Sequence, residues 1–161
     1  MYKRQEQVGV LGGKRSLYRT TDGGQTWTSV GREALSGASV IAIEYIGGNT
    51  FYALCSSKLL KSSDDGQTWT AVDITPLTEL ALSATGMDFY NEENGIITTN
   101  GYVAIYTNDG GESWYVEHYD MDTVFYDAAA VDTGMFYLCG QDGMIIKRTS
   151  ADTTLPILDT I

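Results

Sequence analysis

Paired carboxylates are the residues of this sequence whose types and spacing could do chemistry. They occur as Asp64–Asp65, as Glu92–Glu93 and as Asp120 with Asp122. General acid–base hydrolysis, as in glycoside cleavage, needs two such groups facing each other across a cleft with their pKa values held apart. Adjacency in the sequence does not supply that arrangement, and the first two pairs fall in expected turns. We therefore assign no catalytic residue.

The other reactive side chains also lack the arrangements that catalysis or metal binding requires. His118 is the only histidine, and no Ser, Cys or second His accompanies it in a nucleophile or metal pattern. No calcium-binding loop of the D-x-D-x-D-G type is present. Gly12–Gly13 and Gly110–Gly111 read as turn glycines, because no helix follows them to hold a phosphate. We expect no metal site and no cofactor.

The two cysteines, Cys55 and Cys139, each lie in an apolar run that reads as a strand. They form no C-x-x-C motif, and they are separated by a whole repeat of the pattern described next, too far for a disulfide. Both are expected to be small buried residues. They leave the redox compartment undecided.

A repeated eight-residue motif organises the chain. Three segments align without gaps, at 20–27, 62–69 and 107–114, and their tryptophans are 42 and 45 residues apart. A fourth, decayed copy fits 147–151, with Ala151 in the aspartate position and Thr149 in the hydroxyl position. A period of this length, built from short strands, is typical of the four-stranded blades of a β-propeller.

The strands between these motifs can be counted, and they predict an all-β fold. The expected ranges are 8–11, 16–20 and 26–30 in blade one; 40–46, 50–56, 59–63 and 68–72 in blade two; 86–90, 95–99, 102–108 and 113–118 in blade three; 125–131, 135–139, 144–149 and 155–158 in blade four. We predict a propeller fragment of about four blades of four antiparallel strands, with the innermost strand of blade one lacking. No segment has the 3.6-residue apolar period of a long helix.

Each residue of the repeated motif has a structural explanation. The motif falls in the turn between the third and fourth strands, where an Asp can accept backbone hydrogen bonds from two and three residues on, and a glycine suits a positive φ. The hydroxyl can close the loop, and the Trp can cover it and donate its ring N–H to a carbonyl. The twelve residues expected to do this are Thr20, Asp22, Gly24, Trp27, Ser62, Asp64, Gly66, Trp69, Thr107, Asp109, Gly111 and Trp114.

The motif resembles the Asp-box, or bacterial neuraminidase repeat, S/T-x-D-x-G-x-T/S-W. The longer patterns at 87–95 and 101–107 look like repeats of the photosystem II assembly-factor-like propellers. The resemblance covers about residues 7–150 and implies that the boxes lie on the outer, lower rim, away from any central site. Sialidases that share the repeat use an arginine triad with a Tyr/Glu pair and an acidic Asp. None of these residues can be carried over to this sequence.

A propeller brings the loops between its second and third strands to the face opposite the boxes, the upper face, together with the connections between blades. Loops on a rigid scaffold are where binding residues usually lie. We expect a protein or glycan partner to bind there, through Lys14, Arg15, Lys58, Asn100, Tyr102, Gln141 and Asp142. The alternative is a fragment of a sialidase-like or other glycoside hydrolase propeller whose catalytic residues lie outside this chain.

Charge and termini bound the remaining expectations. With 21 acidic and 10 basic residues the net charge is −11, which disfavours nucleic acid, and no membrane-inserting segment is apparent. We interpret residues 1–6 as a non-native scar on a truncated chain, 7–150 as propeller blades (about 7–32, 38–73, 80–119 and 124–158) and 151–161 as a tail or last outer strand. The open sheet edges predict a chain that either self-associates or is only marginally stable. An extracytoplasmic parent protein is favoured.

Overall fold

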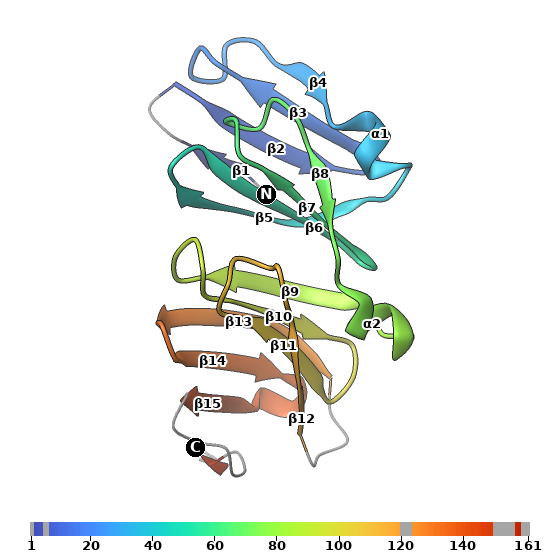
Figure 1. Ribbon diagram of the computed structural model, residues 1–161, viewed down its shortest axis with the longest axis vertical. Helices are drawn as coiled ribbons and strands as arrows, with labels where there is room; N and C mark the ends of the chain where they lie inside the picture. The colour runs from blue at the N-terminus through green and yellow to red at the C-terminus, as the bar shows by residue number, and fades with distance from the viewer. Residues whose placement is uncertain (1, 5–6, 120–123, 150–156, 159–161) are drawn as a thin grey trace. The chain divides into compact units, whose positions relative to one another are not determined.

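The computed structural model describes residues 2–4, 7–119, 124–149 and 157–158, and it gives side chains for 7–119 and 124–149. The chain divides into two compact units, Met1–Asp73 and Ile74–Ile161 (Figure 1). Each unit holds two antiparallel sheets of four strands, in which strands adjacent in sequence are hydrogen-bonded neighbours. Four such sheets in an all-β chain form a partial β-propeller, as predicted.

Sheets 1 and 2 make up the first unit. Sheet 1 consists of β1 (Tyr2–Arg4), β2 (Gly9–Gly13), β3 (Ser16–Thr20) and β4 (Thr28–Val30). Sheet 2 consists of β5 (Val40–Gly47), β6 (Thr50–Cys55), β7 (Lys58–Ser62) and β8 (Thr70–Val72). A one-turn helix, α1 (Arg32–Leu35), connects them.

Sheets 3 and 4 make up the second unit. Sheet 3 consists of β9 (Ala84–Phe89), β10 (Gly95–Thr99), β11 (Val103–Thr107) and β12 (Tyr115–His118), preceded by the short helix α2 (Thr75–Glu79). Sheet 4 consists of β13 (Phe125–Asp132), β14 (Met135–Gly140), β15 (Ile145–Thr149) and β16 (Ile157–Leu158), with a 3-10 turn, η1 (Gln141–Gly143), between β14 and β15. No described helix is long and apolar enough to cross a membrane.

The strand boundaries agree with the sequence-based ranges to within two residues. Alternating apolar and polar residues ended by glycine turns locate a strand well, because both signals are local. One expectation was wrong. The innermost position of sheet 1 is not empty, because β1 pairs antiparallel with β2, Tyr2 opposite Leu11 and Arg4 opposite Gly9. A three-residue strand is too short to show an alternating pattern, so no periodicity in the sequence predicts it.

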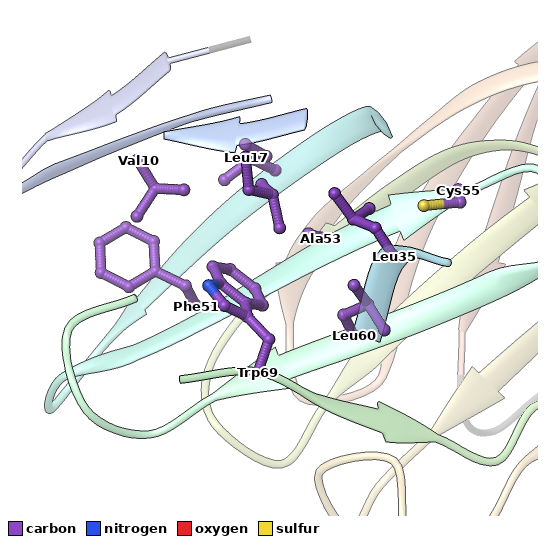
Figure 2. Packing of buried hydrophobic residues seen from close by; sticks show 9 residues of the cluster. Val10, Leu17, Leu35, Phe51, Ala53, Cys55, Leu60 and Trp69 are labelled. Atoms are coloured by element: carbon purple, nitrogen blue, oxygen red, sulfur yellow. The ribbon is translucent and has the colours of Figure 1, made fainter. Parts of the chain in front are cut away.

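The core of the first unit lies between its two sheets. Val10 and Leu17 of sheet 1 pack with Phe51 and Leu60 of sheet 2, and Trp69 lies in the same cluster (Figure 2). All but Trp69 have no exposed surface, and Trp69 is 8% exposed. Burying such side chains contributes roughly 1.5–3 kcal/mol each, which is what holds the two sheets together.

The second unit has an equivalent core between sheets 3 and 4. Ile96 and Ala104 of sheet 3 pack with Phe136, Leu138 and Ile146 of sheet 4, while Phe125 and Tyr119 complete the cluster. A polar link joins the innermost strands, because the backbone N–H of Ala130 donates to Asp88 Oδ2 at 2.8 Å. The two cores therefore repeat one arrangement, in which each sheet is covered on one face by its neighbour in sequence.

Candidate binding surface

Three hairpins, at residues 20–27, 62–69 and 107–114, connect the third and fourth strands of sheets 1, 2 and 3; we call them the Asp–Trp hairpins. In the first, Thr20 Oγ1 donates to Asp22 Oδ1 at 2.7 Å and accepts from Gly24 N at 2.9 Å. Thr26 donates to the same carboxylate through its N–H at 2.9 Å and its hydroxyl at 2.6 Å. These bonds close the loop on itself, so the hairpin needs no ligand.

The second and third hairpins repeat this network. Asp64 accepts from Thr68 N at 2.8 Å, and Asp109 accepts from Ser113 N at 2.9 Å. The expected glycine geometry is present, with φ values of 92°, 79° and 86° at Gly24, Gly66 and Gly111. The expected donor three residues after the Asp contributes in each hairpin, because the backbone N–H groups of Gln25, Gln67 and Glu112 help to lower the pKa of the three carboxylates. The donor four residues after the Asp was not expected from the sequence.

The hydrogen bonds stabilise the ionised form of each hairpin carboxylate. Donation from Thr26 and Thr20 lowers the pKa of Asp22 from 3.8 to about 2. Donation from Ser113 and Thr107 lowers the pKa of Asp109 to about 2. For Asp64 burial acts in the opposite direction, but the bonds from Thr68 and Ser62 outweigh it and keep the pKa below its usual value. A carboxylate held ionised in this way is a poor general acid at neutral pH.

The hairpins also fasten each sheet at its lower end. The residue after each hairpin Asp donates its backbone N–H, at 2.9 Å, to a carbonyl of the turn between the first and second strands: Gly23 to Gln7, Asp65 to Asn49 and Gly110 to Glu93. The side chains of Glu92 and Glu93 are exposed in one of these turns. The hairpins and these turns therefore share one end of each sheet, and the turns between second and third strands lie at the other.

The second hairpin reaches into the core between sheets 1 and 2. Arg19 of sheet 1 donates through Nε to the carbonyl of Asp65 at 2.7 Å. A Cβ built on Gly66 would lie 2.5 Å from Val10 Cγ2, and one on Gly31 would lie 2.9 Å from Trp69 Cδ1. This hairpin is thus a contact between neighbouring sheets as well as a turn.

The decayed fourth copy is placed differently from the prediction. Arg148 lies opposite Phe136, and Phe136 faces the preceding sheet as Phe51 does in sheet 2, where Ser62 lies opposite it. Arg148 therefore occupies the hydroxyl position that was assigned to Thr149. Its guanidinium stacks 3.8 Å from the Tyr106 ring and pairs with Glu117. Residues 150–156, which include Ala151, lie outside the described residues.

Of the candidate upper-face residues in the first unit, Lys14 and Arg15 are exposed in the turn between β2 and β3. Arg15 borders a cleft of about 230 Å³ lined by Arg15, Ser16, Tyr18, Ser29, Val30 and Arg32. Sequence reasoning expected the connection that holds Arg32 on this face without selecting Arg32, and it missed Tyr18 and Ser29, which lie on β3 and β4. The lining therefore includes two arginines, two serines and a tyrosine, residue types suited to a carboxylate or phosphate.

Lys58 has a structural contact that the sequence did not reveal. Its Nζ donates to the carbonyls of Ala34 and Leu35 at 3.1 and 3.4 Å. These are carbonyls at the end of α1, where a cation is favourable. Lys58 is therefore half-buried and engaged within the first unit.

The four candidates of the second unit are exposed, in the turns that follow β10 and β14. Asn100 is partly committed, since its Oδ1 accepts from Ser83 N at 2.9 Å. Tyr102 is 50% exposed, with its ring 6.5 Å from that of His118, which is itself exposed on β12. Gln141 and Asp142 lie in η1, Asp142 with φ 59°. Whether all seven candidates come together at one face stays a prediction.

The cysteines divide in a way that corrects the sequence prediction. Both are free thiols, but only Cys55 is buried, and burial raises its thiol pKa. Cys139 is exposed, because β14 alternates between a covered and an uncovered face. Among the described residues, no group of three or more His, Cys, Asp or Glu side chains could hold a metal ion.

The family follows from a match over most of the chain. Residues 4–130 match the model of the DUF6242 beta-propeller domain. The chain belongs to this family. No protein of curated function matches the sequence.

Solved structures similar to the chain are propellers of several kinds. One is YCF48 bound to D1 peptide, with a TM-score of 0.71 and 21% identity over 98% of this chain and 51% of that one. YCF48 from Cyanidioschyzon merolae has a TM-score of 0.68 and 12% identity, and the match covers 95% of this chain and 51% of that one. An ancestral GH74 enzyme has a TM-score of 0.72 and 18% identity, and the match covers 92% of this chain and 22% of that one. The chain thus spans about half of YCF48 and about a fifth of the GH74 enzyme, and at these identities the likeness concerns the fold.

Proposed function

We propose that this chain is a non-enzymatic propeller module that binds an acidic segment of a partner protein through the cleft between Arg15 and Arg32. The cleft is the observation that carries the proposal. It is lined by both arginines together with Ser16 and Ser29, beside the exposed turn between β2 and β3, where a partner can approach. Neither guanidinium forms an ion pair with any described residue.

The overall charge makes this pair of arginines stand out. The chain carries −11 in total, so acidic ligands are repelled from most of its surface and attracted only where cations gather. Arginine binds a carboxylate through two parallel hydrogen bonds and keeps its charge at all physiological pH values. A side-chain or C-terminal carboxylate of a peptide is the ligand group that this chemistry fits. YCF48, a structural neighbour, has been solved with a peptide bound.

We also assign the three Asp–Trp hairpins to the Asp-box class of repeats. The support is their shared network of hydroxyl, carboxylate and positive-φ glycine in the same strand connection of three sheets. In this assignment the hairpin aspartates are structural, and the carboxylates of the chain are not a catalytic set. A glycan remains the alternative ligand, and a glycoside hydrolase parent remains the second candidate, because GH74 enzymes are structural neighbours.

The test uses synthetic ten-residue peptides that differ in Asp and Glu content and in having a free or amidated C-terminus. Fluorescence anisotropy of the labelled peptides should show preference for acidic ones and weaker binding at higher salt. Arg15→Ala and Arg32→Ala should each weaken binding about tenfold or more. Tyr102→Ala tests whether the exposed candidates of the second unit also contribute to peptide binding. Lys14→Ala is the matched control, because Lys14 is an exposed cation outside the cleft lining.

Two results would overturn the proposal. Unchanged affinity of the Arg15→Ala/Arg32→Ala double variant for the acidic peptides would show that they do not bind in the cleft. Release of reducing ends from a polysaccharide panel by this chain would favour the hydrolase candidate. Lys58 is left out of the test, because replacing it would also remove the bonds to α1.

A further inference from the structure

The interface between sheets 1 and 2 has two halves, which we name by direction. The C-side face of a sheet points toward the next sheet in sequence, and the N-side face points toward the preceding one. Val10 and Leu17 form the C-side face of sheet 1, and Ala53 and Leu60 belong to the N-side face of sheet 2. All four have no exposed surface.

The N-side half of this interface recurs uncovered on sheet 1. Leu11 pairs with Tyr18 across β2 and β3, as Ala53 pairs with Leu60 across β6 and β7. The two pairs are equivalent because Leu11 and Ala53 each lie two residues after the residue opposite the hairpin hydroxyl, which is Gly9 in sheet 1 and Phe51 in sheet 2. Leu11 and Tyr18 are 37% and 39% exposed, although their equivalents in sheet 2 are fully buried. Sheet 1 therefore presents the surface with which sheet 2 receives a neighbour.

The C-side half recurs uncovered on sheet 4. Because Phe136 occupies the place of Phe51, Tyr137 and Ile145 occupy the places that Val10 and Leu17 hold in sheet 1. They are 37% and 50% exposed, and with Cys139 they line an apolar cavity of about 470 Å³. Lys147, opposite Tyr137, stands where Arg19 stands opposite Val10.

We propose that these two faces bind each other between two copies of this chain, sheet 4 of one copy against sheet 1 of the other. The contact would continue the interface between sheets 1 and 2, with Tyr137 and Ile145 in the roles of Val10 and Leu17. Lys147 takes the role of Arg19, which donates to a hairpin carbonyl of the neighbouring sheet. The occupant is a second copy because each chain carries both halves of one repeated interface.

The number of sheets agrees with this contact, and the net charge sets its salt dependence. Two copies supply eight sheets, four from each, which is the upper end of the range of about four to eight blades in closed propellers. The copies repel through their net charge of −11, so added salt should strengthen association.

The contact is a head-to-tail one, which gives it a distinctive test. Leu11→Glu alters only the sheet 1 face, and Tyr137→Glu alters only the sheet 4 face. Sedimentation equilibrium should show a dimer for the parent chain and a dissociation constant raised about hundredfold or more for each variant, because a buried unpaired carboxylate is costly. Tyr90→Glu is the matched control, since Tyr90 is 48% exposed in a turn of sheet 3 and should stay dimeric.

Mixing the two variants decides between head-to-tail and face-to-face association. A Leu11→Glu chain and a Tyr137→Glu chain together keep one unaltered sheet 4–sheet 1 contact, so the mixture should dimerise although neither variant does alone. Ile145→Glu should behave as Tyr137→Glu does, and circular dichroism checks that each variant is folded. Thiol labelling of Cys139 should slow in the dimer, while Cys55 stays unlabelled in both states.

Three results would overturn the proposal. One is a monomeric parent chain at about 100 µM in 0.5 M salt. Another is a mixture of the two variants that stays monomeric. The third is rapid Cys139–Cys139 disulfide formation on oxidation, which would place two sheet 4 faces together. None of these variants changes Arg15 or Arg32, so failure here leaves the peptide-binding proposal standing.

Discussion

The second and third Asp–Trp hairpins are nearly identical in their hydrogen bonds and differ in what their tryptophans do. In both, the hydroxyl accepts from the hairpin glycine, at 2.9 Å for Gly66 and 2.8 Å for Gly111. Trp69 is 8% exposed in the core between sheets 1 and 2 and donates through Nε1 to Gly66 O at 3.0 Å. Trp114 has a buried Nε1 without a hydrogen-bond partner among the described residues, and its ring is perpendicular to that of Phe89, with the ring centroids 6.5 Å apart.

The difference teaches that the motif has two separable parts. The hydroxyl, carboxylate and glycine form a turn from residues within a few positions of one another, so their geometry is the same wherever the motif occurs. The tryptophan projects out of the turn, and the sheet beside it sets its contribution. Substitutions in matched positions of the two hairpins can separate these parts.

Removing the indole should give the largest difference. Trp69→Ala should lower the free energy of unfolding by about 3–5 kcal/mol, because it leaves a cavity in the first core. Trp114→Ala should cost only about 1–2 kcal/mol, since less of its surface is buried. Urea titrations followed by circular dichroism measure both. Equal losses would mean that the tryptophan acts through the turn alone.

Adding a methyl group at the glycine tests the contact with the neighbouring sheet. Gly66→Ala should cost about 2–4 kcal/mol, because it combines a φ of 79° with a Cβ 2.5 Å from Val10. Gly24→Ala in the first hairpin has a φ of 92° and an ordinary 3.6 Å approach to Trp27, and should cost about 1 kcal/mol. Thermal melts of the two variants should rank them in this order. A larger loss at Gly24 would contradict the packing role of the second hairpin.

Acid should weaken the shared part of the hairpins. The pKa values of Asp22 and Asp109 are about 2 in the folded chain, against an ordinary 3.8, so folding favours their ionised forms. Their contribution is complete above about pH 4 and is lost as the pH falls toward 2. The melting temperature should therefore be level above pH 5 and fall below pH 4. An Asp22→Asn/Asp109→Asn double variant should melt at a lower temperature at pH 7, and its melting temperature should fall less steeply below pH 4. An equally steep fall would show that other carboxylates cause the loss of stability in acid.

Replacing the indole by phenyl should give the smallest difference and the clearest contrast in sign. Trp69→Phe loses the bond from Nε1 to Gly66 O and should cost about 1–2 kcal/mol. Trp114→Phe removes a buried N–H that has no partner in the described chain, so its stability should stay within about 0.5 kcal/mol of the parent or rise. A loss of 1 kcal/mol or more at Trp114 would show that its N–H is paired in solution.

The strands and hairpins could be predicted because their causes are local. A box such as 62–69 holds its own donors and acceptors, and strands such as β6 and β10 are bounded by glycine turns and polar residues. The candidate surface was predicted only in part. Arg15 was found from its place in a loop, and the connection that holds Arg32 was expected on the same face, but no sequence signal singled out Arg32 within it.

Sequence by itself determined the repeat, the strand order within sheets 2, 3 and 4 and the turn chemistry, since each depends on residues a few positions apart. Tertiary structure decided which face of a strand is covered, and with it the burial of Trp69, the exposure of Cys139 and the contact between Lys58 and α1. The physical reason is that burial and long-range hydrogen bonds depend on the neighbouring sheet. A strand's own alternation gives two faces but does not say which of them meets a partner.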